Sequence, residues 1–308
     1  MGKYSNEQKK EILRKLDNLA EELGSMSKTT EFTGVSSSVI SSLKSGKYKG
    51  DEDGMYEKIE AYFEARENAE MVGIDSENYV PTSISENVYA NIKNCQLKGG
   101  LAVACGDAGV GKTKAAQKFA GDNPNHCILI TANPCVKGIK SILKCLCEKL
   151  SISEKSIDEM WFAIAGKLRD KMVIVIDEAQ HLPIKTIEAL RAFSDYFNDK
   201  GQTLGIIFVG NNETVHNFRG GKRADFAQII NRTKQNRQYY TTQITKKDVE
   251  KLFPVFVGRE KEIDFLHAIA QSKQALRGAS NLYGQARDNG NITYEGLVAM
   301  AKHMEMEI

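Results

Sequence analysis

Residues 106–113 read Gly106-Asp107-Ala108-Gly109-Val110-Gly111-Lys112-Thr113 and match the phosphate-loop pattern G-x-x-x-x-G-K-[ST] at every fixed position. The apolar LAVAC before this loop predicts a buried strand at 101–105, and KTKAAQKFA predicts a helix that begins at Lys112. A glycine-rich loop between a strand and a helix N-terminus forms a cradle of backbone N–H groups that binds phosphate oxygens. This stretch therefore predicts an α/β fold built around a nucleotide site; a glycine-rich turn without a ligand is the weaker alternative.

The loop also assigns individual roles. All eight of its residues are expected to contact the nucleotide, because glycines let backbone amides turn inward around a polyphosphate. Lys112 would reach the β- and γ-phosphates, and the hydroxyl of Thr113 would be a magnesium ligand. The predicted cofactors are ATP and Mg²⁺, and the predicted activity is ATP hydrolysis.

Short apolar segments alternate with helical periodicity on both sides of the loop. They lie at 101–105, 127–131, 172–176, 205–209 and 239–244. This spacing is typical of strand–helix–strand units in a parallel sheet. After about residue 245 the strand pattern stops, and a helical lid is predicted from four short helices at 245–252, 260–271, 274–288 and 293–304.

An acidic pair follows the third apolar segment. MVIVIDEAQ places Asp177 and Glu178 at the end of a strand, where one carboxylate can hold magnesium and its neighbour can polarise water. We assign Asp177 to the metal and Glu178 to the general base. The next strand, GIIFVG, leads to Asn211, which we expect near the γ-phosphate as a catalytic sensor; a turn-forming asparagine is the alternative.

Basic residues are concentrated in 218–240, which contains six of them and a single acidic residue, Asp225. ATPases are often completed by an arginine from a neighbouring subunit, and Arg232 is the first candidate here, with Arg237 the second. We expect Lys222 and Arg223 to contact DNA. A solvated basic face is the alternative for the whole stretch.

Further basic residues lie elsewhere in the predicted nucleotide domain and lid. Arg277, in QALRGASNL at a helix start, could reach back to the bound phosphates, and a surface arginine is its alternative. Lys137 and Lys140 follow the second strand in TANPCVKGIKS and are expected to contact DNA phosphates without sequence preference. Exposed lysines on a solvated helix are the alternative for this pair.

The N-terminal segment 26–45, MSKTTEFTGVSSSVISSLKS, predicts a helix-turn-helix with its turn at Gly34. Small hydroxyls followed by lysines suit contacts in a DNA groove, and the predicted contacts are Ser37, Ser38, Lys44 and Lys47. Thr30 departs from the alanine usual in such motifs, and a helical protein-interaction domain is the alternative. The predicted domains are 1–70, helix-turn-helix; 71–85, linker; 86–244, ATPase; and 245–308, lid.

Composition narrows the class of protein. The 308 residues include 42 basic and 40 acidic ones, a net charge of +2 that excludes a basic tail protein or an acidic disordered one. The sequence lacks both a run of about 18 apolar residues and a secretory N-terminus, so we expect a cytoplasmic protein without a membrane partner. The 6 cysteines are expected to be buried thiols, with a zinc site as the weaker reading.

These motifs, in this order, resemble the AAA+ ATPase family of phage Mu transposition protein B. VACGDAGVGKT resembles the family's phosphate loop, VIVIDEAQHL its acidic strand, FVGNNE its sensor strand and QALR its second sensor. VISSLKSGKYKGDED and FRGGKRADFAQIINR are the more specific parts. The chain departs from the family pattern at Asp107-Ala108, where Asn-Pro is frequent, at Gln180, where Asp is frequent, and at Gln274, where Gly is frequent.

The resemblance implies a function as well as a fold. The fold would be an AAA+ parallel sheet with a C-terminal helical lid, preceded by the small all-α domain. The family binds double-stranded DNA largely non-specifically when ATP is bound, and it assembles on that DNA as a helical filament. It delivers target DNA to a transposase of the DDE type and stimulates strand transfer, while DNA and the transposase stimulate ATP hydrolysis.

Two other functions fit the same motifs. A helicase loader of similar AAA+ type would bind a replicative helicase and favour single-stranded DNA. A transcription regulator would read one operator through its helix-turn-helix and use the nucleotide only as a switch. Stimulation by double- or single-stranded DNA separates the first alternative, and a single specific footprint would identify the second.

Overall fold

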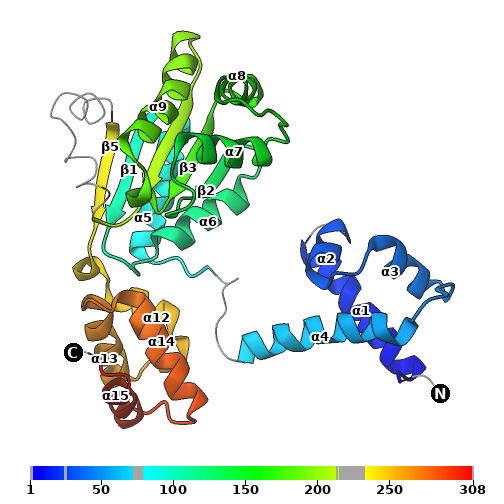
Figure 1. Cartoon of the computed structure of the whole chain (residues 1–308). Coiled ribbons are helices and arrows are strands. Elements are labelled where there is room, and N and C mark those ends of the chain that lie inside the picture. Colours follow the sequence, from blue (N-terminus) through cyan, green and yellow to red (C-terminus); the bar gives the residue numbers. More distant parts are fainter. Residues whose placement is uncertain (1–2, 24–25, 72–78, 213, 215–232, 307–308) are drawn as a thin grey trace. The chain divides into compact units, whose positions relative to one another are not determined.

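The computed structural model describes residues 3–23, 26–71, 79–212, 214 and 233–306. Contacts divide the chain into two compact units, Met1–Glu77 and Asn78–Ile308 (Figure 1). Each unit buries apolar side chains of its own. Within the described ranges, no helix combines the length and the apolar character that a membrane span needs. The finer four-part division stays a prediction.

The N-terminal unit is helical. Its described helices are α1 (Asn6–Leu23), α2 (Met26–Thr33), α3 (Ser37–Lys44) and α4 (Glu52–Met71). Leu16, Ile40, Tyr56 and Ile59 lie in its core. Gly34 turns the chain between α2 and α3 with φ +66°, a conformation that favours glycine, so the predicted turn is where the sequence placed it.

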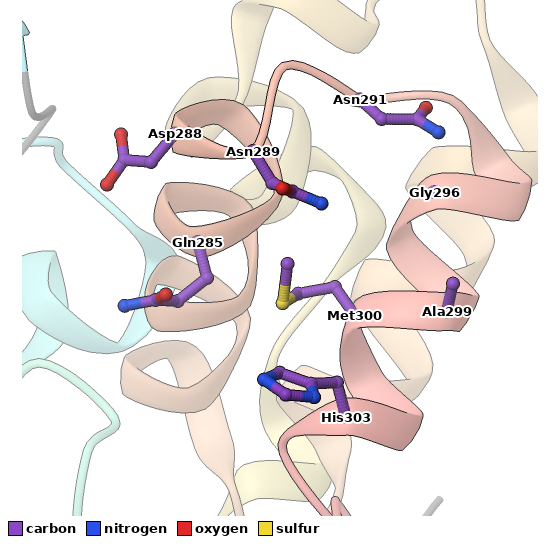
Figure 2. Close-up of a pocket in the computed structure, with 8 residues that line it drawn as sticks. All are labelled: Gln285, Asp288, Asn289, Asn291, Gly296, Ala299, Met300 and His303. Atoms are coloured by element: carbon purple, nitrogen blue, oxygen red, sulfur yellow. The ribbon is translucent and has the colours of Figure 1, made fainter.

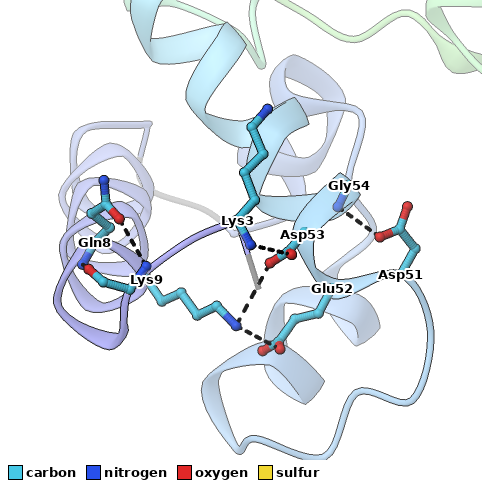
Figure 3. Close-up of polar contacts among 8 residues, drawn as sticks. Lys3, Gln8, Lys9, Asp51, Glu52, Asp53 and Gly54 are labelled. Carbon is cyan, nitrogen blue, oxygen red and sulfur yellow. Dashed lines mark hydrogen bonds and ion pairs between the residues drawn. The ribbon is translucent and has the colours of Figure 1, made fainter. Parts of the chain in front are cut away.

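Polar contacts hold the start of this unit to the acidic start of α4 (Figure 3). The backbone N–H of Lys3 donates to Asp53 Oδ2 at 2.7 Å, and Lys9 Nζ lies 2.8 Å from Glu52 Oε2. Asp51 accepts from the N–H of Gly54 at 3.0 Å. Acidic side chains at a helix N-terminus interact favourably with its partial positive charge, so these contacts stabilise the first turn of α4.

The second unit contains a five-stranded parallel sheet in the order β2-β3-β4-β1-β5. The strands are β1 (Gly100–Gly106), β2 (Cys127–Thr131), β3 (Met172–Asp177), β4 (Leu204–Val209) and β5 (Thr233–Tyr239). β3 and β4 are buried along their whole length, as expected for strands covered on both faces. The predicted parallel sheet is confirmed.

Two layers of helices cover the sheet (Figure 1). One layer consists of α5 (Ser83–Lys98) and α6 (Lys112–Asp122), and its core includes the β1 residues Ala102 and Ala104. The other consists of α7 (Ile139–Lys149), α8 (Ile157–Lys167) and α9 (Ile184–Asp199), and its core includes Leu101, Val103 and Cys105. Alternate residues of β1 thus face opposite layers, as the pleat of a strand requires.

The position predicted for the last strand is wrong. The apolar pattern suggested 239–244, whereas β5 ends at Tyr239 and is followed by the short 3-10 helix η2 (Thr241–Gln243). β5 lies at the sheet edge beside β1 and reads TKQNRQY, because an edge strand need not be apolar on both faces. Ile244, which contributed to the apolar pattern of 239–244, is buried in the core that the sheet shares with the lid.

The lid follows the sheet. Its elements are α12 (Lys246–Leu252), η3 (Pro254–Phe256), α13 (Glu260–Gln271), α14 (Ala275–Asp288) and α15 (Tyr294–His303), close to the four predicted helices. Phe256, Leu266, Leu282 and Leu297 are fully buried in the same core as the α5–α6 face of the sheet. The lid therefore packs continuously with the α/β part of this unit.

A buried carboxylate joins the start of α5 to the start of α12. Asp248 accepts from the N–H and hydroxyl of Ser83, both at 2.6 Å, and from the N–H and hydroxyl of Thr245 at 2.9 and 2.8 Å. Burial by itself raises the pKa of Asp248, but these hydrogen bonds together outweigh it, so the pKa lies below its ordinary value.

We predict that Asp248→Asn lowers the free energy of unfolding at pH 7 by about 1–3 kcal/mol, since it weakens a buried hydrogen-bonded charge. Because the folded pKa is depressed, the stabilisation is present above the unfolded pKa of about 3.9 and is lost as pH falls through the folded value. Urea unfolding at pH 7 and pH 3, followed by the fluorescence of the single tryptophan, Trp161, measures both effects.

Asp264→Asn is the matched control, because Asp264 forms an exposed ion pair with Lys246 in the same lid. It should change stability by less than about 1 kcal/mol. If Asp248→Asn loses stability on acidification as steeply as the unmodified chain, Asp248 does not carry this pH dependence.

Candidate active site

The predicted phosphate loop lies at the carboxyl end of β1 and leads into α6. Gly106 has φ +143°, and a Cβ there would lie 1.9 Å from the carbonyl oxygen of Tyr239 at the end of β5. Gly109 has φ +78°, and its Cβ would lie 3.0 Å from Cβ of Ala275 and 3.2 Å from Cβ of Arg277 in the lid. The loop is therefore enclosed by β5 on one side and by the lid on the other, and these two positions require glycine.

Lys112 is buried inside the loop, at the first position of α6. Its Nζ donates to the carbonyl oxygen of Gly106 at 3.1 Å and to that of Asp107 at 2.6 Å. Burial lowers its pKa, and the nearby acids Asp177 and Glu178 partly oppose that shift. The amine thus lies where the loop backbone turns, held by neutral acceptors that a phosphate oxygen could replace.

Asp177 and Thr113 meet at the same edge of the sheet. Asp177 ends β3 with 3% of its surface exposed, and the hydroxyl of Thr113 is hydrogen-bonded to its side chain. Burial raises the pKa of Asp177, while the bonds from Thr113 and from the N–H of Glu178 partly offset it. A hydroxyl and a carboxylate oxygen in contact beside a phosphate loop fit Mg²⁺, which takes oxygen ligands and is held by few protein groups.

Glu178 follows Asp177 in a left-handed conformation, with φ +54°. Its Oε2 accepts from the side-chain amide of Gln180. The carbonyl oxygen of the same amide accepts from the N–H of Asn211 at 3.3 Å. Gln180 therefore links the predicted base to the predicted sensor, a role that the sequence showed only as a departure from the family pattern.

A second link that sequence reasoning missed starts at the loop itself. The carboxylate of Asp107 accepts from the side-chain amide of Asn212 and from the backbone N–H of Thr241. Asn212 was not singled out, although it follows Asn211 directly after β4. Its position directly after a buried strand was the feature of the sequence that could have identified it as a site residue.

Known proteins share this architecture. The family described as AAA domain matches residues 96–218. The ATP-dependent target DNA activator B of Escherichia phage Mu is 28% identical over 253 residues, which are 80% of this chain and 77% of that protein. The Mu-like prophage FluMu DNA transposition protein B of Haemophilus influenzae is 26% identical over 257 residues, 81% of this chain and 87% of its own length.

Over about four fifths of its length the chain is therefore similar to the phage Mu transposition B proteins. Its fold is the AAA+ α/β fold, as predicted. Among solved structures, the ORC1 protein of Aeropyrum pernix in complex with DNA is similar, with a TM-score of 0.54 at 13% identity, over 76% of this chain and 69% of that one. At that identity the likeness concerns the fold alone.

The arginines expected from this family are only partly described. Arg232, Lys222 and Arg223 lie outside the described residues. Arg237 lies on β5 and is exposed. Arg277 is exposed in the first turn of α14, and its Cβ lies beside the position of Gly109 described above. The start of the lid helix therefore packs against the phosphate loop, and a contact of the arginine with the phosphates stays a prediction.

The predicted DNA contacts of the N-terminal unit lie on and after α3. Ser37, Ser38, Lys44 and Lys47 are exposed. The hydroxyl of Ser38 lies 3.0 Å from that of Ser36, and Lys44 forms an ion pair with Asp17 on α1. A DNA phosphate would therefore compete with a carboxylate of the same unit for Lys44.

Lys137 and Lys140 are both exposed, between β2 and the first turn of α7. The carbonyl oxygen of Lys137 accepts from the hydroxyl of Thr186, which is buried near the start of α9. This bond fixes the backbone of the loop while both amines face solvent. The loop thus presents two cations on a positioned backbone.

A separate pocket lies in the lid (Figure 2). It has a volume of about 560 Å³ and lies between α14 and α15. Its polar lining includes Gln285, Asp288, Asn291 and His303, and Met300 supplies an apolar wall. None of the predicted nucleotide or DNA residues lines this pocket, so it does not belong to the phosphate-loop site.

We predict that Gly106→Ala destabilises the second unit by more than about 2 kcal/mol, because its methyl group would overlap the backbone of β5. Gly121→Ala is the control, since Gly121 lies in α6 with nothing within 4 Å of its Cβ position. The control should be neutral or stabilising by about 0.5–1 kcal/mol. Urea unfolding followed by Trp161 fluorescence compares the two, and equal stabilities would refute the packing described for β1 and β5.

Proposed function

We propose that this chain is an ATP-dependent, DNA-binding ATPase that selects target DNA and delivers it to a DDE transposase, stimulating strand transfer. The observation that carries the proposal is the meeting of Lys112, Thr113 and Asp177 at one sheet edge, in a chain similar to phage Mu transposition protein B. The relative from phage Mu is an ATP-dependent target DNA activator. The protein would act in the cytoplasm of a bacterial host.

Different residues of the site would have separate roles in ATP hydrolysis. Backbone N–H groups of 106–113 and the amine of Lys112 would hold the phosphates, with Arg277 reaching them from the lid. Thr113 and Asp177 would hold Mg²⁺, which neutralises charge developing on the phosphates. Once its carboxylate is released from Gln180, Glu178 would polarise the attacking water. Asn211 would act as the sensor near the γ-phosphate. Arg232, or else Arg237, would enter from a neighbouring subunit and so link hydrolysis to assembly.

DNA binding would be spread over two surfaces. Lys137 and Lys140 would contact phosphates from the ATPase domain, together with Lys222 and Arg223. Ser37, Ser38, Lys44 and Lys47 would contact DNA from the helix-turn-helix domain. Because each subunit offers few such contacts, tight binding requires many subunits placed side by side in an ATP-dependent helical filament on double-stranded DNA. ATP hydrolysis, stimulated by DNA and the transposase, would then dismantle the filament.

The two rival functions predict different results. A helicase loader would show ATPase stimulation by single-stranded DNA above that by double-stranded DNA. An operator-reading regulator would protect one specific footprint instead of coating DNA in proportion to its length. Double-strand stimulation combined with length-proportional coating supports the target-selection function against both.

We predict that Lys112→Ala abolishes ATP binding and with it the ATP-dependent filaments on DNA, because the phosphates lose their buried cation. The control is Lys114→Ala, an exposed lysine of the same helix, which should bind ATP normally. Titration with a fluorescent ATP analogue measures binding, and electron microscopy with DNA and a non-hydrolysable ATP analogue detects filaments. Unchanged filament formation by Lys112→Ala would contradict the mechanism.

We also predict that the double variant of Lys137→Ala and Lys140→Ala binds DNA more weakly, by similar factors for unrelated sequences. Each lost phosphate contact should make the slope of log K against log salt shallower by about 0.9. Lys155 and Lys167, exposed residues flanking and ending α8, give a control double variant with the same change in net charge. Equal slopes for the two variants would show that Lys137 and Lys140 do not contact DNA.

A further inference from the structure

The carboxylate of Asp107 joins the phosphate loop to two other segments. Its Oδ1 accepts from the side-chain amide of Asn212, just beyond β4, at 3.0 Å. Its Oδ2 accepts from the backbone N–H of Thr241 at 2.8 Å. Both oxygens thus have partners that are distant in sequence, a pattern that differs from a local cap within the loop.

Thr241 places this bond at the entrance to the lid. It begins η2, which connects the end of β5 to α12. The backbone N–H of Asp107 also donates to the carbonyl oxygen of Tyr239 at 2.8 Å, two residues before Thr241. Any movement of Asp107 therefore shifts the connection between sheet and lid or breaks these hydrogen bonds.

The loop touches the lid at a second point. The space above Gly109 is filled by Ala275 and Arg277 at the start of α14. Asp107 and Gly109 lie within one short loop, so the loop cannot reshape around a ligand without disturbing at least one of its two lid contacts. The carboxylate contact is the one that a side-chain substitution can remove without introducing a clash.

The carboxylate of Asp107 places a negative charge close to the buried amine of Lys112. Lys112 is the buried cation of the loop, and Asp107, Asp177 and Glu178 all act on it as negative charges. The carbonyl oxygen of Asp107 also accepts from Lys112 at 2.6 Å. A polyphosphate held by the same loop would bring further negative charge close to the Asp107 carboxylate, and like charges in a partly buried site repel.

We propose that Asp107 is a positioning residue that couples nucleotide binding to the lid, and that its charge weakens the binding of ATP. The carboxylate holds the lid connection to the loop through its hydrogen bonds to Asn212 and Thr241. A nucleotide must bind against its charge, and the resulting shift of the loop is transmitted to Thr241. Coupling of this kind is reciprocal, so the state of the lid also sets the affinity for ATP. This inference rests on the proposed ATP binding.

Asp107→Asn tests the charge, since the amide can keep both hydrogen bonds if the amide of Asn212 turns over. We expect it to bind ATP more tightly than the unmodified chain, by about threefold or more at low salt. The difference should shrink as salt is raised, because salt screens charge repulsion. Asp158→Asn, the same charge change at an exposed site on α8, should leave the affinity unchanged.

Asp107→Ala tests the connection, since it removes both hydrogen bonds. Hydrogen exchange of the full chain with and without a non-hydrolysable ATP analogue measures the protection of amides in 241–252. We expect the analogue to change this protection in the unmodified chain and in Asp107→Asn, but not in Asp107→Ala at saturating analogue. If Asp107 had a purely structural role, its substitution would lower thermal stability, but Asp107→Asn and Asp107→Ala would show the same hydrogen-exchange response to the analogue.

The outcomes distinguish the inference from the proposed function. If the unmodified chain fails to bind ATP, both fall. If it binds ATP and Asp107→Asn binds equally or more weakly at low salt, the inference alone is overturned. The same follows if Asp107→Ala keeps the full lid response. Should Asp107→Ala not fold, the salt-dependent affinity of Asp107→Asn still decides.

Discussion

The hydrogen bond between Thr113 and Asp177 spans the central part of the sheet edge, and the site is arranged around it. β4 lies between β1 and β3, so the loop after β1 and the acid after β3 approach each other across the end of β4. Parallel strands bring their carboxyl ends to one edge, where helix N-termini also gather. The same order explains why Asn211 and Asn212, which follow β4, contact both sides of the site.

Burying Asp177 is costly unless its oxygens find donors, and the fold supplies them from two directions. Thr113 donates from the start of α6, and the N–H of Glu178 donates at 3.0 Å from the turn after β3. That turn has a left-handed Glu178, a strained conformation for a residue with a side chain. In this turn Asp177 is buried at the sheet edge, while the side chain of Glu178 contacts Gln180.

Sequence patterns predicted the parts of this structure that depend on local chemistry. Strands buried on both faces carry continuous apolar runs, and the loop glycines are fixed by backbone geometry, so β3, β4 and the phosphate loop could be predicted. The edge strand β5 could not, because TKQNRQY has no apolar run. Nor could the partners of Asp107, which lie 105 and 134 residues away, since tertiary packing alone brings them together.

The distribution of charge supports the proposal that tight DNA binding would depend on assembly. In the N-terminal unit, Lys44 already forms an ion pair with Asp17. A DNA phosphate that bound Lys44 would therefore contribute only the difference in free energy between the two ion pairs. In the second unit, Lys112 is turned inward and satisfied by carbonyl oxygens, whereas Lys137 and Lys140, which follow β2, face solvent. A subunit that relied on these two cations alone would bind DNA weakly and in a salt-sensitive manner. In the proposed filament such contacts would be repeated and would add with high effective concentration, so a small nucleotide-dependent change in subunit contacts would become a large change in DNA occupancy.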